Sequence, residues 1–495
     1  LKNRLPQALV RAFADDTGVV VPDFASYAPT IMSIFQEFAK ISNLALNLSK
    51  TVLIPLWESS ADSIRRWLRS DLPDWAGVEI SWAARYLGYY IGPQRLSKSW
   101  DKAHAEFEKR VMAWSSLHLG MQLNSRVYRT FCLSLFSFLW QLEEPPPHVQ
   151  KAELWALRRF APGPGNWIRP LDLRHLKHRF GHPFDFPSFL HLNLAAKLRV
   201  LQYEPQIDWS ACRDQLQEAR STATFVRPAW ATWYQNSHSL IVLRASAHAE
   251  ALGISSGTVR TNLLHVHRGS RSRSILDQCI KKGFQAEAVR QLVASDPYNH
   301  EHVLRRKLSR WVIQEVPSGT LSRRAVRILG KSFALVPPRV ALVLFRTVFN
   351  GWCTARRFQV KEAKCLLGCD PGSRQGCHDS IEHYAHCPVV RHFAMHSLNI
   401  PQSCVGGLFN FLCMKPVDDE VLTLQLLLAF AVYSATNCLR FARPQVAMNA
   451  MHEFLLQYVH QGASTMTCAQ KVVHKYLALR RTQRRVAYSP VVQAS

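Results

Sequence analysis

The stretch that decides the fold of the N-terminal region is Ala8–Val21, which reads ALVRAFADDTGVVV. An apolar run precedes the acidic pair Asp15-Asp16, and three valines follow Thr17-Gly18. Two apolar runs around a short polar segment predict a β-hairpin with both carboxylates at its tip. Because successive strand residues point to opposite faces, the two aspartates can serve one metal site only where a tight turn redirects them. An ordinary acidic surface turn is the alternative, since Asp and Gly are common turn residues.

The segments that follow this hairpin mix helix and strand. Residues 28–42 have helical periodicity, 44–56 read as a strand, a short helix is expected near 59–70, and 84–92 (ARYLGYYIG) form another strand. From about residue 97 the apolar pattern is helical. The sequence therefore predicts an α+β fold, in which a β-hairpin sheet with helices precedes a mainly α-helical region.

Three motifs in this first part resemble one enzyme family. Phe13-Ala14-Asp15-Asp16 resembles the Tyr/Phe-x-Asp-Asp signature of reverse transcriptases, in the FADD form of non-LTR (LINE-type) retrotransposons. Residues 38–51 (FAKISNLALNLSKT) resemble the next palm motif of that family, and Arg85-Tyr86-Leu87-Gly88 is similar to its primer-grip hairpin. Asn43 stands where the family usually has Gly, a mild departure because Asn tolerates left-handed backbone.

The resemblance implies a division of the chain. We expect a partial polymerase palm over residues 1–95 and a helical thumb over 96–145, where RVMAW ends at Trp114. The regions expected after the thumb are a basic helical region over 146–345, a zinc-knuckle region over 346–400 and a C-terminal helical region over 401–495.

The resemblance also implies roles for single residues. Asp15 would be the main magnesium ligand of this motif and Asp16 its less directly coordinating neighbour, in a site where carboxylates hold two magnesium ions about 4 Å apart. Lys50 matches a lysine that assists departure of pyrophosphate, although a strand-end lysine facing solvent is the alternative. The residues that would position the primer terminus, or else form ordinary strand core, are Tyr86, Leu87 and Gly88.

The upstream half of this family's catalytic domain has no counterpart in the sequence. The chain begins with Leu1, only 14 residues before Asp15, whereas the family's first catalytic aspartate and its fingers lie many residues upstream. We therefore expect a fragment whose missing partner is the upstream part of the same polyprotein. Because two carboxylates cannot assemble the usual two-metal site, we predict that this chain alone does not polymerise DNA.

The charge of the chain favours a polyanionic partner. Sixty-one Lys and Arg residues against 35 Asp and Glu give a net charge of +26, which argues against an acidic or wholly disordered protein. Residues 251–350 carry 17 basic and 5 acidic side chains, whereas residues 1–100 carry 11 and 9. The side chains expected to contact nucleic-acid phosphates are Arg305, Arg306, Lys307, Arg310, Arg323, Arg324, Arg356 and Arg357.

Aromatic side chains stand among the last of these basic residues. Asn350–Phe358 (NGWCTARRF) has a composition suited to stacking on bases, or else is a helix end with buried aromatics. The implied partners are an RNA template and a DNA primer or target.

Four of the twelve cysteines crowd into residues 365–387, CLLGCDPGSRQGCHDSIEHYAHC. This distribution indicates a reducing compartment with one local metal site rather than a secreted, disulfide-linked protein. Zinc prefers four tetrahedral sulfur or nitrogen ligands, and two close pairs supply them: Cys365 with Cys369, and His383 with Cys387. The stretch resembles the CCHC knuckle downstream of the thumb in many non-LTR elements. Competing ligands are Cys377, His378 and His386, and unligated cysteines in a reduced core are the alternative.

These observations favour a fragment of an RNA-directed DNA polymerase that takes dNTPs and acts inside the cell, in nucleus and cytoplasm. A non-catalytic nucleic-acid-binding remnant with a zinc knuckle is the second hypothesis, and a zinc-dependent scaffold on anionic lipids is the third. The best transmembrane stretch, Val421–Tyr433, is short and interrupted by Thr423 and Gln425, so we expect a buried helix there. We interpret the acids Asp418-Asp419-Glu420 as helix-capping residues rather than an endonuclease site.

Overall fold

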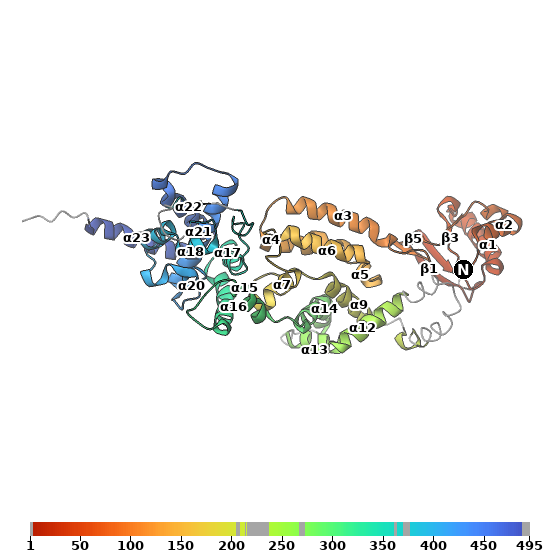
Figure 1. Cartoon of the computed structure of the whole chain (residues 1–495). Helices are drawn as coiled ribbons and strands as arrows, with labels where there is room; N and C mark the ends of the chain where they lie inside the picture. Colours follow the sequence, from red (N-terminus) through yellow and green to blue (C-terminus); the bar gives the residue numbers. More distant parts are fainter. Residues whose placement is uncertain are drawn as a thin grey trace, which may run out of the picture. The chain divides into compact units, whose positions relative to one another are not determined.

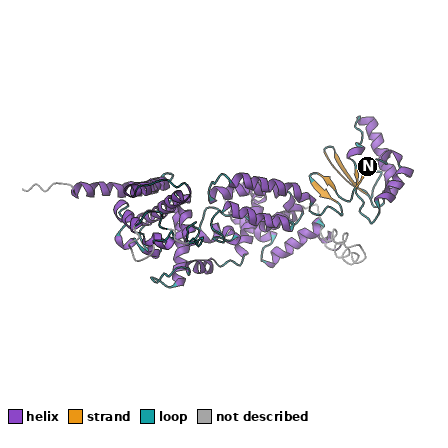
Figure 2. Cartoon of the chain, turned by 45° about the horizontal axis from the view of Figure 1, so that its top comes forward, coloured by secondary structure: helices purple, strands orange, loops and turns teal. Residues whose placement is uncertain are grey.

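A computed structural model describes residues 3–203, 208–212, 214, 237–266, 273–360, 364–369 and 377–487. The described chain is mainly helical and contains three small two-stranded sheets, all within the first hundred residues (Figure 2). It divides into two compact units. Unit 1 comprises residues 1–107, 135–150 and 192–288, and unit 2 comprises 108–134, 151–191 and 289–495.

The hairpin expected at the acidic pair is confirmed. Strands β1 (Leu9–Phe13) and β2 (Asp16–Val20) pair antiparallel, and Phe13 lies opposite Asp16 (Figure 1). Ala14 and Asp15 therefore form a two-residue turn, and Ala14 has a positive φ of 53°. A positive φ at the first turn position matches the twist of the two strands, but Ala adopts it at a steric cost.

A second hairpin lies at the predicted strand 84–92. Strands β5 (Ala84–Tyr86) and β6 (Tyr89–Ile91) are joined by Leu87 and Gly88, whose φ angles are 48° and 86°. Positive φ at both central positions is the requirement of a type I′ turn, which Gly meets freely and Leu does not.

Two helices supply the core of this N-terminal part. Helix α1 (Phe24–Ser42) and helix α2 (Ala61–Asp71) bury Ala28, Ile31, Ile64 and Leu68 in one cluster, together with Leu72, Trp75 and Val78. Asp23 and Ser60 cap their N-termini by accepting from Ser26 N and Ser63 N. Asn43 ends α1 in the left-handed conformation, with φ 59°.

The strand expected over residues 44–56 is much shorter in the structure. Residues Leu48–Lys50 form a 3₁₀ turn, and only β3 (Val52–Leu53) is extended, pairing parallel with β4 (Glu79–Ile80). The Asn47 side chain accepts from Lys50 N at 3.3 Å and from the Ser49 hydroxyl at 2.7 Å. These local side-chain bonds offer the backbone an alternative to a β-ladder, which is why the strand prediction is wrong before Val52.

The helical part of unit 1 is organised around a buried carboxylate. Trp100 Nε1 donates to Glu143 Oε2 at 2.8 Å, and Arg95 forms an ion pair with Glu143 at 2.9 Å. Lys197 Nζ donates to the Glu143 carbonyl at 3.1 Å. The helices wholly or partly in this unit are α3 (Lys98–Ser115), α5 (Leu139–Leu142), α9 (Phe189–Tyr203), α12 (His238–Ala251), α13 (Ser256–Val266) and α14 (Arg273–Ser295).

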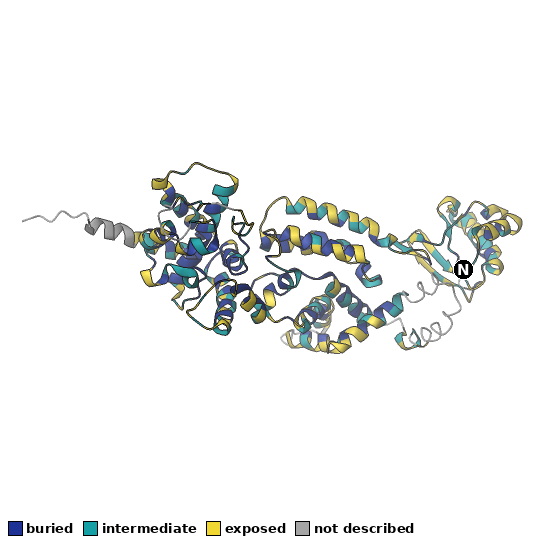
Figure 3. Cartoon of the chain, in the orientation of Figure 1, coloured by how far each residue is buried: buried dark blue, intermediate teal, exposed yellow. Residues whose placement is uncertain are grey.

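Helix α21 (Asp419–Phe441) is the central helix of unit 2. Every residue from Val421 to Val432 is buried, as the dark blue of α21 in Figure 3 shows. In the described part of the chain it is the one helix long and apolar enough to cross a membrane, and 78% of its apolar window is buried inside the protein. The prediction of a buried helix is confirmed, and so is the capping role of Asp418, whose carboxylate accepts from Val421 N at 2.8 Å.

Other helices of unit 2 pack on or near α21. Helix α17 (Pro338–Val348) and helix α22 (Met451–Ala463) contact it directly, and a Cβ at Gly462 would lie 2.9 Å from the Phe430 ring. The further helices wholly or mostly in unit 2 are α4 (Met121–Val127), α6 (Pro147–Phe160), α7 (Pro170–Arg174), α8 (Leu176–Phe180), α15 (His300–Leu308), α16 (Ser318–Leu335), α18 (Ile381–His386), α19 (Pro388–His392), α20 (Gly407–Phe411) and α23 (Thr467–Ala487).

Candidate metal centre

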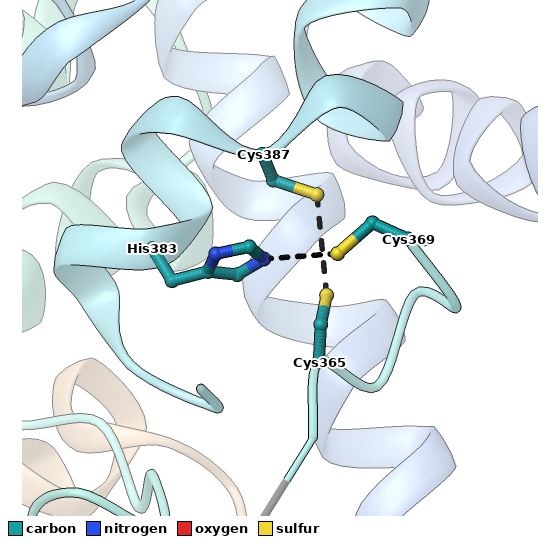
Figure 4. A group of neighbouring side chains, drawn as sticks. All are labelled: Cys365, Cys369, His383 and Cys387. Atoms are coloured by element: carbon teal, nitrogen blue, oxygen red, sulfur yellow. Dashed lines mark hydrogen bonds between the residues drawn. The ribbon is translucent and has the colours of Figure 1, made fainter. Parts of the chain in front are cut away.

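The four ligands predicted for zinc come together in unit 2. The ligand atoms of Cys365, Cys369, His383 and Cys387 all lie within 4.8 Å of one another (Figure 4). Cys365 Sγ is 3.9 Å from Cys387 Sγ, and Cys369 Sγ is 3.3 Å from His383 Nε2. Zn–S bonds of about 2.3 Å and Zn–N bonds of about 2.0 Å in a tetrahedron place such atoms about 3.8 Å and about 3.5 Å apart. The cluster can therefore hold a metal ion such as zinc.

Local structure positions each pair of ligands. Gly368, with φ 71°, turns the chain between the first two cysteines, and its N–H donates to the Cys365 carbonyl at 3.3 Å. Helix α18 carries His383, and the Ser380 hydroxyl caps this helix by accepting from His383 N at 3.0 Å. Cys387 follows the last residue of α18, so that His383 and Cys387 face the same side.

Burial and hydrogen bonds between the ligand side chains shift the pKa values of the thiols. The exposed fractions of Cys365, Cys369 and Cys387 are 7%, 8% and 1%. The hydrogen bond with Cys365, together with the neighbouring His383, lowers the pKa of the Cys387 thiol to about 4. Burial raises the pKa of Cys369 to about 12 in the absence of a cation. A bound zinc ion would favour the thiolate at all three positions.

The competing ligands are placed differently. His378 and His386 have exposed side chains that are not members of the cluster. Cys377 lies beside the cluster, because its carbonyl accepts from Cys365 N at 2.8 Å and its side chain interacts with Cys369. The turn Asp370–Ser373 lies outside the described residues.

A buried carboxylate beside the centre was not among the predicted residues. Asp379, 3% exposed, forms an ion pair with Arg440 of α21 in which both carboxylate oxygens lie 2.8 Å from one guanidinium nitrogen. It also accepts from the Tyr384 hydroxyl at 2.7 Å and from Ala355 N at 2.9 Å. Asp379 therefore connects the segment that carries the cysteine–histidine cluster to α21 and to the segment after α17. The sequence signal that could have suggested a structural role is its position directly before the helix-capping Ser380.

Trp352 cannot stack on a nucleic-acid base. It is 1% exposed, its indole N–H donates to the Thr347 hydroxyl at 3.0 Å, and its ring lies 5.1 Å from that of Tyr433. Within the segment Asn350–Phe358, the large aromatic that remains exposed is Phe358, at 55%. The alternative interpretation of this segment, with a buried aromatic among solvated arginines, holds for Trp352.

The predicted phosphate-contacting residues divide into exposed and buried side chains. Lys307 is 2% exposed and its ammonium donates to the Trp167 carbonyl at 2.5 Å, so it does not lie on the surface. Arg324 is half-buried and lies over the ring of Phe409. The exposed members are Arg305, Arg306, Arg310, Arg323 and Arg356, with Arg357 half-buried.

Three of these arginines gather at one place. Burial lowers the pKa of Arg310, and the neighbouring charges of Arg357 and Arg306 lower it further. Arg357 donates to the Gly165 carbonyl at 2.8 Å. In the described chain no carboxylate lies within 4.0 Å of the guanidinium nitrogens of these three residues, whereas Arg356 pairs with Glu382. We call Arg306, Arg310 and Arg357 the arginine cluster.

The residues of the reverse-transcriptase resemblance lie in unit 1. Asp15 and Asp16 are exposed at the tip of the β1–β2 hairpin. Tyr86 lies against this hairpin, since its hydroxyl is 3.5 Å from the Arg11 carbonyl and a Cβ at Gly18 would lie 3.5 Å from its ring. Leu87 and Gly88 form the turn of the neighbouring hairpin, and Lys50 is exposed at the end of its 3₁₀ turn.

The carboxylate pair has no third partner in the part of the chain that the structure describes. The cysteine–histidine cluster is the one described group of three or more Cys, His, Asp or Glu residues whose ligand atoms all lie within 4.8 Å. No described hydrogen bond or ion pair joins the Lys50 side chain to either aspartate.

Comparison with models of known protein families finds no match to this chain, and comparisons with curated proteins and with solved structures find none either.

Proposed function

We propose that this chain is a C-terminal portion of a non-LTR-type reverse transcriptase. In this proposal it contributes one carboxylate pair to a two-magnesium site and grips nucleic acid through a zinc-stabilised basic domain. The observation that carries the proposal is the two-residue turn of the β1–β2 hairpin, which presents Asp15 and Asp16 together at an exposed tip. Magnesium prefers such hard oxygen ligands.

The backbone of this turn supports a functional rather than an incidental role. A non-glycine residue at positive φ costs about 1–2 kcal/mol, and such residues cluster at active sites and ligand-binding turns. Ala14 adopts this conformation, with φ 53°, although a glycine at the same position would do so without the cost of a Cβ. The Tyr86 ring beside Gly18 is consistent with a primer-positioning hairpin next to the carboxylates.

The chemistry assigned to these residues is limited to what two carboxylates can do. Asp15 and Asp16 would hold and orient magnesium, which activates the attacking 3′-hydroxyl and stabilises charge on the leaving pyrophosphate. The described residues place no third carboxylate beside them, so the proposed partner for catalysis is the upstream part of the same polyprotein. Lys50 is proposed to approach the pyrophosphate only in that assembly.

The exposed arginines support the nucleic-acid part of the proposal. The arginine cluster holds three positive charges with no carboxylate within 4.0 Å in the described chain, which is unfavourable unless an anion or solvent compensates them. Guanidinium groups bind phosphate groups through paired hydrogen bonds. A non-catalytic nucleic-acid-binding protein is the second candidate function, favoured because no third carboxylate lies beside the pair among the described residues.

Primer extension distinguishes the two candidates. The chain alone, with a primed RNA template, dNTPs and magnesium, is expected to give no extension. A chain lengthened by its upstream coding sequence is expected to extend the primer, and Asp15→Asn is expected to reduce its rate at least 100-fold. Asp62→Asn, an exposed carboxylate on α2, is the matched control and should leave the rate unchanged. Extension by Asp15→Asn at the parental rate would refute the polymerase proposal.

Salt-dependent RNA binding tests the basic surface separately. The triple variant Arg306→Ala/Arg310→Ala/Arg357→Ala is expected to weaken binding to single-stranded RNA and to lower the salt slope of log K by about 2. The control triple Arg65→Ala/Arg66→Ala/Arg69→Ala removes the same charge from the exposed face of α2 and is expected to have a smaller effect. Equal slopes for both triples would show that net charge, and not the cluster, binds RNA. Tighter binding to anionic vesicles than to RNA would favour a lipid partner.

A further inference from the structure

Three histidines gather on unit 2 outside the cysteine–histidine centre. His392 ends α19, His396 lies in the π-helical turn Phe393–Ser397 that follows, and His452 lies in the first turn of α22. The ring centroids of His392 and His396 are 4.3 Å apart, and those of His392 and His452 are 4.8 Å apart. No motif in the sequence marks this group, because 56 residues separate His396 from His452.

The distance between two ring nitrogens is the key observation. His392 Nδ1 lies 3.4 Å from His452 Nε2. Two imidazole nitrogens bound to one tetrahedral zinc ion at about 2.0–2.1 Å are about 3.4 Å apart. The two nitrogens are therefore already separated as ligands of one ion would be, and His396 is exposed, so its side chain can rotate to supply a third.

The residues next to these histidines are packed in the protein interior. Phe393 and Ala394, next to His392, are fully buried, and Met451, next to His452, is 3% exposed. The Phe393 ring also lies 5.7 Å from that of His452. Ligands on packed helices keep their geometry better than ligands on loops, and single π-turns are frequent at functional sites.

We propose that His392, His396 and His452 form a second metal site, for a divalent transition-metal ion of the zinc class. Neutral imidazole suits Zn²⁺, Ni²⁺ and Cu²⁺, whereas Mg²⁺ and Ca²⁺ prefer oxygen ligands. Three protein nitrogens leave a fourth position of the tetrahedron for water or an anion. The side chains are exposed or half-exposed, so the ion can exchange with solvent, unlike an ion among buried thiolates.

The direct test is cobalt titration of the full chain after removal of bound metal. Co²⁺ is a spectroscopic probe for zinc sites: thiolate ligands give an intense near-ultraviolet charge-transfer band, whereas three histidines with water give weak visible bands alone. We expect two cobalt ions per chain, of which the first produces the thiolate band. The double variant His392→Ala/His452→Ala is expected to bind one cobalt ion with the thiolate band unchanged.

Two further variants control this test. His460→Ala, an exposed histidine farther along α22, should still bind two ions. Cys369→Ser should lose the thiolate band and keep the second ion. An unchanged thiolate band in the double variant also shows that the surrounding fold is intact. The proposal is refuted if the parent chain binds only one cobalt ion at 0.1 mM, or if the double variant still binds two.

The pH dependence of metal binding gives an independent check on the same site. Metal binding requires neutral imidazoles, so protons compete with the ion and the second cobalt ion should be released when the solution is acidified. A second ion whose binding does not change with pH would contradict the assignment.

Discussion

The acidic hairpin of unit 1 and the cysteine–histidine centre of unit 2 were both recognisable in the sequence, but they differ in how far they are buried and packed. The hairpin has two strands, exposed carboxylates and exposed apolar side chains, among them Phe13 at 67% and Leu9 at 51%. The centre is enclosed by buried cysteines and joined to α21 through Asp379. A two-stranded ribbon is marginal by itself, whereas a ligand cluster inside a helical core is held from several sides. The difference teaches that unit 2 brings four possible metal ligands together from its own residues, whereas the proposed role of the hairpin requires ligands from outside it.

Loss of one thiolate is expected to have the largest effect on unit 2. Cys369→Ser should abolish tight zinc binding and lower the free energy of unfolding of unit 2 by about 3–5 kcal/mol, because metal binding contributes directly to folding. Zinc content and thermal melting measure both effects. Cys353→Ser, a half-buried cysteine of the same unit outside the cluster, should retain zinc and melt as the parent does. If the two variants behave alike, the centre does not stabilise unit 2.

Removal of Arg440 tests whether the link to α21 is essential to the centre. Arg440→Met leaves the charge of the buried Asp379 carboxylate without its cationic partner. We expect this to lower the free energy of unfolding, measured in urea, by about 3–5 kcal/mol. The double variant Asp379→Asn/Arg440→Met should recover part of that loss. Lys475→Met breaks the exposed ion pair with Glu420, which solvent screens, and should lower the free energy of unfolding far less than Arg440→Met. If Arg440→Met and Lys475→Met lowered the free energy of unfolding equally, the charge of Asp379 would not need Arg440 as a buried partner.

Each unit contains a buried lysine, so the pH dependence of the free energy of unfolding can be compared between the two units. Burial lowers the pKa of Lys197 in unit 1 to about 7 and of Lys307 in unit 2 to about 8. Below these values each lysine is charged in both the folded and the unfolded state, and the burial penalty is fully present. Between them and about 10.5 only the unfolded state keeps the proton, so the free energy of unfolding rises with pH.

At about 1.4 kcal/mol per pKa unit, the full rise up to pH 10.5 is at most about 5 kcal/mol for Lys197 and about 3.5 kcal/mol for Lys307, and solvent screening reduces the second value. Urea unfolding at several pH values should show a smaller rise in Lys307→Met above pH 8 and in Lys197→Met above pH 7. The exposed Lys109→Met is the control and should follow the parent. If either variant had the same pH profile as the parent chain, the ammonium group of the replaced lysine would be hydrated in the folded parent.

The smallest expected effect concerns the turn of the second hairpin. Leu87→Asn should stabilise the β5–β6 hairpin by less than about 1 kcal/mol, because Asn-Gly adopts the positive φ angles of this turn more readily than Leu-Gly. Hydrogen exchange of the Tyr86 and Tyr89 amides would detect slower opening. Leu44→Asn, an exposed leucine without positive φ, should not slow exchange. Faster exchange in Leu87→Asn would show that the Leu87 side chain stabilises the hairpin by contacts.

Predictions from the sequence succeeded where neighbours along the chain determine the outcome. The spacing of Cys365 with Cys369 and of His383 with Cys387 identified the four side chains that the structure brings together, since each pair closes over one turn. The strand expected before Val52 was wrong because Asn47 bonds its own local backbone. Phosphate contact by Lys307 and base stacking by Trp352 were expectations that burial of both side chains opposes, and composition alone does not reveal which polar or aromatic residues pack inward.

The sequence by itself determined the acidic turn, the cationic character, the buried apolar helix near residue 421 and the four residues of the cysteine–histidine cluster, because each depends on local spacing or summed composition. Only the tertiary structure decided which cations remain on the surface, that Asp379 meets Arg440, and that His392 meets His452. Those contacts join residues about 60 positions apart, and their distances depend on how α18, α19, α21 and α22 pack. Packing of that kind is set by the shapes of many side chains together, and no local pattern in the chain encodes it.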